Sequence, residues 1–269
     1  MEEKMKELEK VSKDVRKDIV NMIYNAKSGH PGGSLSCVDI LVSLYFHIMD
    51  LKLDEKGNRI DKFVLSKGHA APAYYATLAE CGFIPKKDLE TLRKVDSYLE
   101  GHPTNKINGI DASSGSLGQG LSIASGMALS KKVYNENGYV YCILGDGEMQ
   151  EGQIWEALMS INKYKLSNLV IFVDYNGLQI DGNVCDVMPI NPLKEKIEAF
   201  GINVLIVDGH SHKEIIDAVD EAKKNMNSAT VIIANTIKGK GVSFMENNAS
   251  WHGKAPNDEE YKIALEELS

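Results

Sequence analysis

The sequence has few of the features that mark secreted or membrane proteins. It contains four cysteines in 269 residues and no Cys-x-x-Cys pair, which argues against a zinc ribbon, a redox pair or a disulfide framework. Its most apolar stretch, residues 37–51, is interrupted by Asp39 and Asp50 and is too short to span a bilayer. Residues 1–20 are rich in lysine and glutamate and lack the apolar core of a signal peptide. We therefore expect a cytoplasmic protein without a membrane segment.

Positive charge is also in short supply. Lysine and arginine number 30 against 38 aspartates and glutamates, a formal charge of −8, which disfavours a general nucleic-acid binder. The hydrophobic share of 43% is normal for a globular protein. No repeat, low-complexity tract or linker divides the chain, so residues 1–269 are expected to form one domain.

The N-terminal part predicts two helices around a glycine-rich loop. Residues 8–26 place apolar side chains three and four apart, which is typical of an amphipathic helix. Glycine and proline in residues 28–33 should end it and form a loop that carries His30. Ser36, with Asp39 three residues later, is expected to cap a second helix that ends near residue 49.

Strand and helix patterns alternate through the rest of the chain. Most strand candidates are continuous apolar runs, which favours a parallel sheet covered by helices on both faces, and thus the α/β class. A loop-rich insertion is expected at residues 97–114. The predicted strands are 62–66, 139–144, 169–174, 203–207 and 230–235, and the predicted helices are 72–81, 117–133, 150–164, 193–200 and 212–224.

Polar and glycine-rich residues follow the predicted strands. Ligands of open parallel sheets bind at the carboxyl ends of strands, so these residues should converge on one edge. They are Lys67-Gly68-His69, Gly145-Asp146-Gly147, Asn176-Gly177, Gly209-His210 and Lys238-Gly239-Lys240-Gly241.

Asp146 and Asn176 indicate a metal site at that edge. They follow neighbouring strands 30 residues apart, and a carboxylate with an amide oxygen suits Mg²⁺ or Ca²⁺, which would in turn hold a diphosphate. The Leu178 carbonyl is a candidate third ligand. Alone, Gly-Asp-Gly is more often a turn with a capping aspartate.

Residues 115–120, Gly-Ser-Leu-Gly-Gln-Gly, precede a helix of small residues. Such an entrance lets an anionic ligand approach the backbone, although it is more often a packing solution, here against another helix or a second subunit. Glu151 and Glu156 follow on the next predicted helix. A solvated face is their ordinary explanation, but Glu151 is close enough to the metal strand to be buried at an interface beside a cofactor.

Four of the seven histidines sit beside glycine in predicted loops. Imidazole can donate to phosphate, shuttle protons or ligate zinc, and the wide spacing without nearby cysteine makes zinc the weaker interpretation. The four are His30, His69, His102 and His252, whereas His47, His210 and His212 are expected to be structural.

Six motifs in order resemble the amino-terminal half of the transketolase family, over essentially the whole chain. They are Ser-Gly-His-Pro-Gly (28–32), Ser-Lys-Gly-His-Ala (66–70), Glu-Gly-His-Pro-Thr (100–104), Ser-Leu-Gly-Gln-Gly (116–120), Gly-Asp-Gly-Glu-Met-Gln-Glu-Gly (145–152) with Asn176, and Trp-His-Gly-Lys (251–254).

The resemblance implies a thiamine-diphosphate-binding fold of the diphosphate-holding type. By this match Asp146, Asn176 and the Leu178 carbonyl would hold Mg²⁺. The cofactor would be contacted by Lys67, His69, Gly115, Leu117, Gly147, Glu151, Asn176, Lys238 and His252. The histidines that would face the sugar and handle its hydroxyl protons are His30, His102 and His252. A departure from many relatives is Tyr175, where they carry asparagine or an acidic residue.

The family moves a two-carbon ketol unit from a ketose phosphate to an aldose phosphate, with thiamine diphosphate as electron sink. A full-length member continues into pyrimidine-binding and carboxy-terminal domains, which carry the glutamate that activates the cofactor. The resemblance therefore implies a split enzyme, in which a carboxy-terminal transketolase subunit is the partner and two copies of each chain assemble. The alternatives are a truncated chain, a sister enzyme such as dihydroxyacetone synthase or another ketol transferase, and a non-catalytic cofactor-binding or regulatory subunit.

Overall fold

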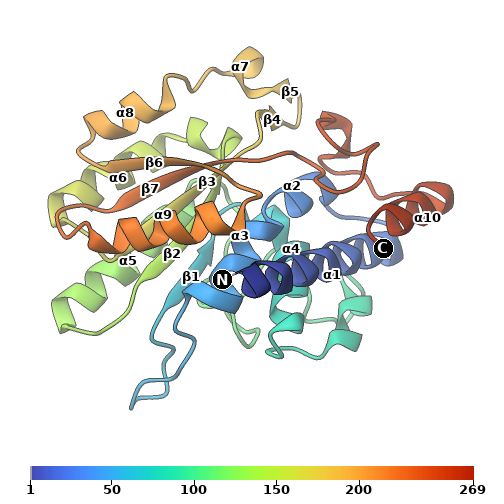
Figure 1. Cartoon of the computed structure of the whole chain (residues 1–269), viewed down its shortest axis with the longest axis horizontal. Coiled ribbons are helices and arrows are strands. Elements are labelled where there is room, and N and C mark those ends of the chain that lie inside the picture. The colour runs from blue at the N-terminus through green and yellow to red at the C-terminus, as the bar shows by residue number, and fades with distance from the viewer. Residues whose placement is uncertain (1) are drawn as a thin grey trace.

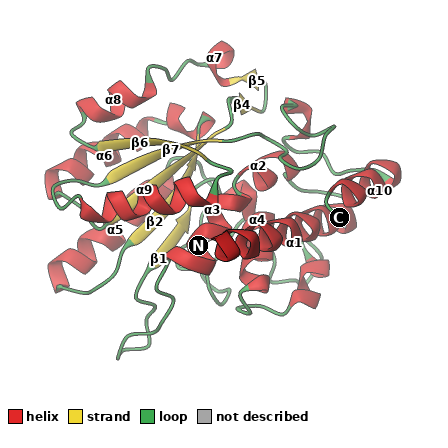
Figure 2. Ribbon diagram, viewed as in Figure 1, coloured by secondary structure: helices red, strands yellow, loops and turns green. Residues whose placement is uncertain are grey.

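The computed structural model describes residues 2–269. Five parallel strands form one sheet in the order β1-β2-β3-β7-β6, so the last strand of the chain is inserted between β3 and β6 (Figures 1 and 2). The bounds agree with the predicted strands to within one residue, and the expected α/β class is confirmed. The strands are β1 Lys62–Leu65, β2 Val140–Gly145, β3 Leu169–Tyr175, β6 Asn203–Asp208 and β7 Thr230–Asn235.

Alternate side chains of the strands enter two separate cores. In β2, Tyr141 and Ile143 join the core that contains α1 (Glu2–Ala26), α3 (Val38–Ser43), α4 (Ala71–Glu80) and α9 (His212–Lys224). Cys142 and Leu144 join the core that contains α5 (Gln119–Tyr134), α6 (Gly152–Tyr164) and α8 (Leu193–Ala199). Because successive side chains of a strand point to opposite faces, continuous apolar strands require helices on both sides. Each fully buried leucine or isoleucine contributes about 1.5–3 kcal/mol. Helices cover both faces, as expected (Figure 1).

Most of the predicted helices are present with small shifts at their ends, but the helix expected up to residue 49 is divided into an α-helix, Val38–Ser43, and a π-helical turn, Leu44–Ile48. The first helix is longer than predicted, because its apolar stripe continues on the N-terminal side of residue 8. The helices are α1 Glu2–Ala26, α2 Pro31–Ser36, α3 Val38–Ser43, α4 Ala71–Glu80, α5 Gln119–Tyr134, α6 Gly152–Tyr164, α7 Val184–Val187, α8 Leu193–Ala199, α9 His212–Lys224 and α10 Asp258–Glu267. Shorter turns of 3₁₀ or π geometry are η1 Leu44–Ile48, η2 Gly68–Ala70, η3 Lys86–Thr91, η4 Gly147–Gln150 and η5 Ala249–Trp251.

The glycine-rich segment after α1 differs from the expectation of a loop. The chain is helical again from Pro31, which occupies the first helical position, where its missing N–H costs nothing. The predicted cap at Ser36 is therefore wrong: Ser36 ends α2, and its hydroxyl donates to Asp174 at 2.6 Å instead. Every residue from Pro31 to Ser36 is buried, so tertiary packing decided this local structure.

A small hairpin and a short helix beyond β3 were not predicted. Strands β4 Leu178–Gln179 and β5 Gly182–Asn183 pair antiparallel and lead into α7. Two residues per strand are too few for an alternating pattern to be visible in a sequence. Within residues 2–269, none of the helices has the length and apolar character needed to cross a membrane.

Candidate active site

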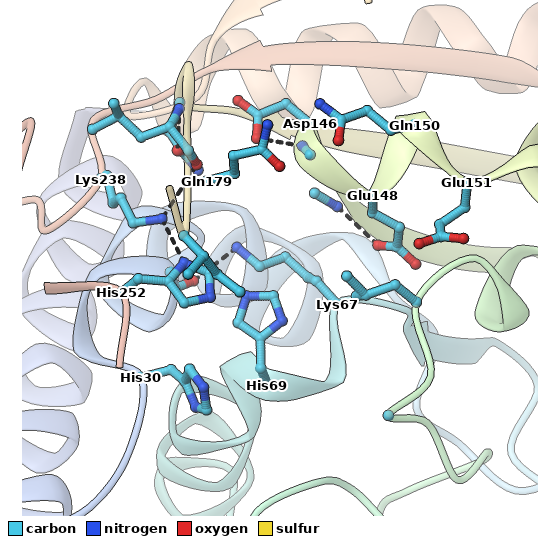
Figure 3. Close-up of a pocket in the computed structure, with 18 residues that line it drawn as sticks. His30, Lys67, His69, Asp146, Glu148, Gln150, Glu151, Gln179, Lys238 and His252 are labelled. Carbon is cyan, nitrogen blue, oxygen red and sulfur yellow. Dashed lines mark hydrogen bonds between the residues drawn. The ribbon is translucent and has the colours of Figure 1, made fainter. Parts of the chain in front are cut away.

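A pocket of about 310 Å³ opens at the carboxyl edge of the sheet (Figure 3). Residues that follow β1, β2, β3 and β7 line it, together with the start of α2, the 115–117 loop and residue 252. The edge predicted from the sequence is therefore a real concave site. It gathers every predicted site residue except His102, namely His30, Lys67, His69, Gly115, Leu117, Asp146, Gly147, Glu151, Asn176, Leu178, Lys238 and His252.

Three of the predicted histidines form a cluster at one end of the pocket. The ring centroids of His30, His69 and His252 lie 5.2–5.5 Å apart in each pairing. Burial lowers the pKa of His30 to about 4, with the Arg93 charge as the next cause, and lowers the pKa of His252 to about 3, followed by the Lys238 charge. Burial also brings the pKa of His69 well below its ordinary value. At neutral pH all three imidazoles are uncharged, so each can give or take a proton.

Lys238 connects this cluster to the hairpin. Its ammonium donates to Nδ1 of His252 at 3.0 Å and to the Leu178 carbonyl at 3.2 Å. Because Nδ1 of His252 accepts, the ring proton of His252 is on Nε2. Burial, followed by the Lys67 charge, lowers the pKa of Lys238 to about 8. No carboxylate of residues 2–269 lies within ion-pair distance of this ammonium, which leaves its charge for an anion in the pocket.

Lys67 lies at the floor of the same pocket but is already paired. Its ammonium donates to the carboxylate of Asp174 and, at 2.8 Å, to the Gly33 carbonyl. Asp174 also accepts from Ser36 and Thr236. The positive charge of Lys67 is therefore balanced inside the protein, so Lys238 is the stronger candidate for holding an anion.

Asp146 presents a buried carboxylate, 2% exposed, at the end of β2. Its oxygens accept from the backbone N–H groups of Gly147 at 2.7 Å and Gly177 at 2.5 Å, which orient them. Burial, and next the nearby Asp174, raises its pKa to about 6. A cation beside Asp146 would remove this penalty on the charged carboxylate.

The predicted metal ligands fit a hard divalent cation. Asp146, Asn176 and Leu178 all line the pocket and supply a carboxylate, an amide oxygen and a carbonyl, the oxygen ligands that Mg²⁺ prefers. The Asn176 amide oxygen accepts from the Leu178 N–H at 3.2 Å, and a second lone pair remains for a cation. Among residues 2–269 no cluster of three or more histidine, cysteine or acidic side chains has metal-binding geometry, so oxygens of a bound diphosphate and water would have to complete the shell.

Nearly the whole sequence matches one known family. Residues 8–268 match the family model described as "Transketolase, thiamine diphosphate binding domain". This chain belongs to the transketolase family. The match agrees with the resemblance seen in the six motifs.

Two similar transketolase subunits have almost the same length as this chain. An apulose-4-phosphate transketolase subunit of Phocaeicola vulgatus is 42% identical over 97% of this chain and 94% of its own length. The 6-deoxy-6-sulfo-D-fructose transketolase subunit SqwG of a Clostridium species is 42% identical over 100% of this chain and 98% of its own length.

Other transketolases are longer than this chain and are similar to it over part of their length. The human transketolase is 42% identical over 94% of this chain, which spans 40% of the human protein. The crystal structure of the Campylobacter jejuni transketolase superposes with a TM-score of 0.89 at 34% identity, covering 97% of this chain and 42% of that one. The chain thus spans about two fifths of the length of these transketolases.

The pocket also contains a buried carboxylate, Glu148, that was not predicted from the sequence. Glu148 is 2% exposed and accepts from the Ser66 hydroxyl and from the N–H groups of Gly118, at 2.9 Å, and Gly145, at 3.0 Å. It therefore holds the 115–118 loop against the ends of β1 and β2. Its position directly after Gly-Asp-Gly, at the carboxyl end of a predicted strand, could have marked it as a residue of the site.

Glu151 was expected on a helix and buried at an interface, and it is neither in this chain. It is the residue before α6 rather than a helical residue, and its side chain lines the pocket yet is exposed. Glu156, on α6, is exposed as well. Burial of Glu151 would require another chain over this face.

His102 lies beside the main pocket and not in its lining. Its ring is next to Gly115, where an added Cβ would come within 3.4 Å of it, and it lines a separate shallow pocket with Arg93. Burial, followed by the Arg93 charge, lowers the pKa of His102. Gly33, Gln150 and Gln179 line the main pocket without having been predicted. A Cβ at Gly33 would lie 3.2 Å from Nε2 of His69, so glycine keeps that wall open.

Proposed function

We propose that this chain is the amino-terminal subunit of a two-chain transketolase. It would transfer a two-carbon ketol unit from a ketose phosphate to an aldose phosphate with thiamine diphosphate and Mg²⁺. The observation that carries the proposal is the similarity to relatives named as transketolase subunits, which this chain matches at 42% identity over 94–98% of their length. The free state of all four cysteines supports a cytoplasmic location.

The diphosphate end of the cofactor would lie between Asp146 and Lys238. Asp146, Asn176 and the Leu178 carbonyl would hold Mg²⁺, and Lys238 would contribute the positive charge that its surroundings leave unpaired. His69 and the Gly147 backbone would contact the phosphates, and Gly115 and Leu117 would line the cofactor. When bound, thiamine diphosphate supplies the electron sink that lets a carbon–carbon bond next to a ketone break.

The neutral histidines would handle protons of the sugar. His30 and His252 face each other across 5.5 Å, and Nδ1 of His30 is buried with no hydrogen-bond partner among residues 2–269. An imidazole of this kind holds a hydroxyl group and accepts its proton as the bond to the neighbouring carbon breaks. His102 would assist from the adjacent shallow pocket.

A second chain is needed to complete the site in this proposal. The partner would be a carboxy-terminal transketolase subunit that carries the pyrimidine-binding half, with two copies of each chain. The names of the similar subunits support a partner. Exposed apolar residues on and beside α5 and α6 support close approach of another chain. They are Leu117, just before α5, Ile123 of α5 and Met159 of α6, and α5 also exposes the small residues Ser122 and Gly126.

Native mass spectrometry of the complex purified from its own source would test this proposal. We expect a second chain of complementary type and thiamine diphosphate to travel with this one, and the complex to transfer ketol units between sugar phosphates. A complex that contains the partner and cofactor but lacks transfer activity would favour the non-catalytic alternative. A cofactor-bound homodimer of this chain without a partner would overturn the two-chain proposal.

A further inference from the structure

His210 lies beyond the carboxyl end of β6, beside the pocket but not in its lining. Its Nδ1 is 2.7 Å from a carboxylate oxygen of Asp39, and its Nε2 accepts the backbone N–H of Ile237 at 2.9 Å. Because a backbone N–H can only donate, Nε2 carries no proton, so Nδ1 carries it and donates to Asp39. The two bonds fix the tautomer and the ring orientation.

Asp39 is a firm anchor for this imidazole. Arg16 donates two hydrogen bonds to it, of 3.1 and 2.6 Å, and the Arg16 and Asp39 side chains are 9% and 7% exposed. Burial alone would raise the pKa of Asp39, but the Arg16 charge and the His210 hydrogen bond hold it well below its usual range. Asp39 therefore remains a charged acceptor that joins α1 and α3 to His210.

The second hydrogen bond of His210, the one to Ile237, connects it to the pocket. Ile237 is the residue before Lys238, whose ammonium reaches the Leu178 carbonyl and His252. Thr236, on the other side, is held by its hydroxyl on Asp174. After the end of β7, Thr236 is therefore bonded to Asp174 of the buried Lys67–Asp174 pair, and Ile237 is bonded to His210.

We propose that His210 is a positioning residue, which acts through the Ile237 N–H to hold Lys238 in the pocket at the place where it meets the cofactor diphosphate. The assignment rests on the proposed function for its ligand, but the placement of Lys238 is a property of this chain alone. Groups that orient a ligand-binding residue commonly change affinity by about tenfold or more when removed.

Two substitutions separate the two bonds of His210. In His210→Gln the side-chain oxygen can replace Nε2 and accept from Ile237. In His210→Asn the amide reaches only the Nδ1 position, so it keeps the bond to Asp39 and loses the bond to Ile237. We expect His210→Asn to weaken binding of thiamine diphosphate with Mg²⁺ about tenfold in calorimetry of the assembled enzyme, and His210→Gln to restore most of the affinity.

His212 is the matched control. It is a buried histidine whose Nε2 lies 3.8 Å from the carboxylate of Asp39, with contacts to Ser43 at 2.8 Å and Ser12 at 3.2 Å and none to Ile237. His212→Leu should lower the thermal midpoint while leaving the affinity for thiamine diphosphate within twofold. A double-mutant cycle with Lys238→Met completes the design, because His210→Asn should add little to the loss that Lys238→Met already causes.

A measurement without cofactor tests the placement of Lys238 directly. Lys238 is 2% exposed, so its amine should be acylated slowly by an added anhydride, as followed by mass spectrometry. We expect this rate to rise severalfold in His210→Asn and to remain unchanged in His210→Gln and His212→Leu. Equal acylation rates and equal cofactor affinities in all variants would overturn the inference. A wild-type enzyme that binds no thiamine diphosphate would instead overturn the proposed function, while the acylation rates still decide the role of His210.

Discussion

Lys67 and Asp174 form an ion pair that is almost completely removed from solvent, with side chains 2% and 0% exposed. Lys67 lies two residues after β1 and Asp174 is the penultimate residue of β3, so the pair spans β2, the strand between them, at the sheet edge. Desolvation of two charges is costly unless each finds further hydrogen bonds, and here Gly33, Ser36 and Thr236 provide them. The pair joins α2, β1, β3 and the segment after β7 directly beneath the pocket.

Breaking this pair should be strongly destabilising. Lys67→Met leaves a buried carboxylate without its cation, and we expect a loss of about 3–5 kcal/mol in the free energy of unfolding, measured by urea denaturation. Lys238→Met is the matched control, because it removes an equally buried ammonium that has no carboxylate partner among residues 2–269. Its loss in the free energy of unfolding should be clearly smaller, because no buried carboxylate is left without its cation. Similar losses for the two variants would show that the Asp174 pairing contributes little.

Asp146 should be required for metal-dependent cofactor binding. We expect Asp146→Ala to abolish the Mg²⁺-dependent part of thiamine diphosphate binding, because it removes the only carboxylate of the proposed ligand set. Calorimetry with and without Mg²⁺ would measure this. Asp186→Ala, an exposed carboxylate on α7, serves as the control and should leave the affinity unchanged. Unchanged affinity in Asp146→Ala would remove Asp146 from the metal site.

His30 should act on the substrate more than on the cofactor. His30→Ala is expected to leave thiamine diphosphate affinity within a few-fold and to lower kcat by about a hundredfold, since general acid–base groups contribute on this scale. His47→Ala, an exposed histidine, is the control for steady-state kinetics. Loss of cofactor affinity without a separate effect on kcat would place His30 at the diphosphate.

The histidine cluster should make the free enzyme less stable in mild acid. The folded-state pKa values of His30 and His252 are about 4 and 3, and an unfolded histidine has about 6.5. Between pH 6.5 and 4 the unfolded chain therefore binds more protons, so stability is retained above pH 6.5 and falls as the pH drops. Asp146, with its pKa raised to about 6, opposes this trend in part, because its stabilising contribution grows as the pH falls below 6.

Urea denaturation at pH 7 and pH 5 with a metal chelator would measure this effect. The fall in stability between the two pH values should be smaller in the His30→Gln/His252→Gln double variant than in the wild type. An equal fall in both proteins would mean that these imidazoles titrate normally in the folded state.

Much of the site could be predicted because ligands of open parallel sheets bind at the carboxyl ends of strands, and locating those ends requires only the strand boundaries. The runs that end at Leu65, Gly145, Tyr175 and Asn235 are apolar enough to be recognised locally, and parallel pairing then places the residues that follow them together. The local structure of residues 31–36 and the β4–β5 hairpin could not be predicted in the same way, because buried neighbours and long-range contacts stabilise them.

The amino-acid sequence by itself determined the α/β class, the five strands and the identity of most residues at the pocket, since hydrophobic periodicity and residue chemistry are local properties. Only the tertiary structure decided which charges are free. It paired Lys67 with Asp174, left Lys238 without a carboxylate, buried Glu148 against Gly118 and turned His210 towards Asp39 and Ile237. Those relationships join residues that are 27 to 171 positions apart, and ion pairing and hydrogen bonding depend on distance in space, which no sequence pattern specifies.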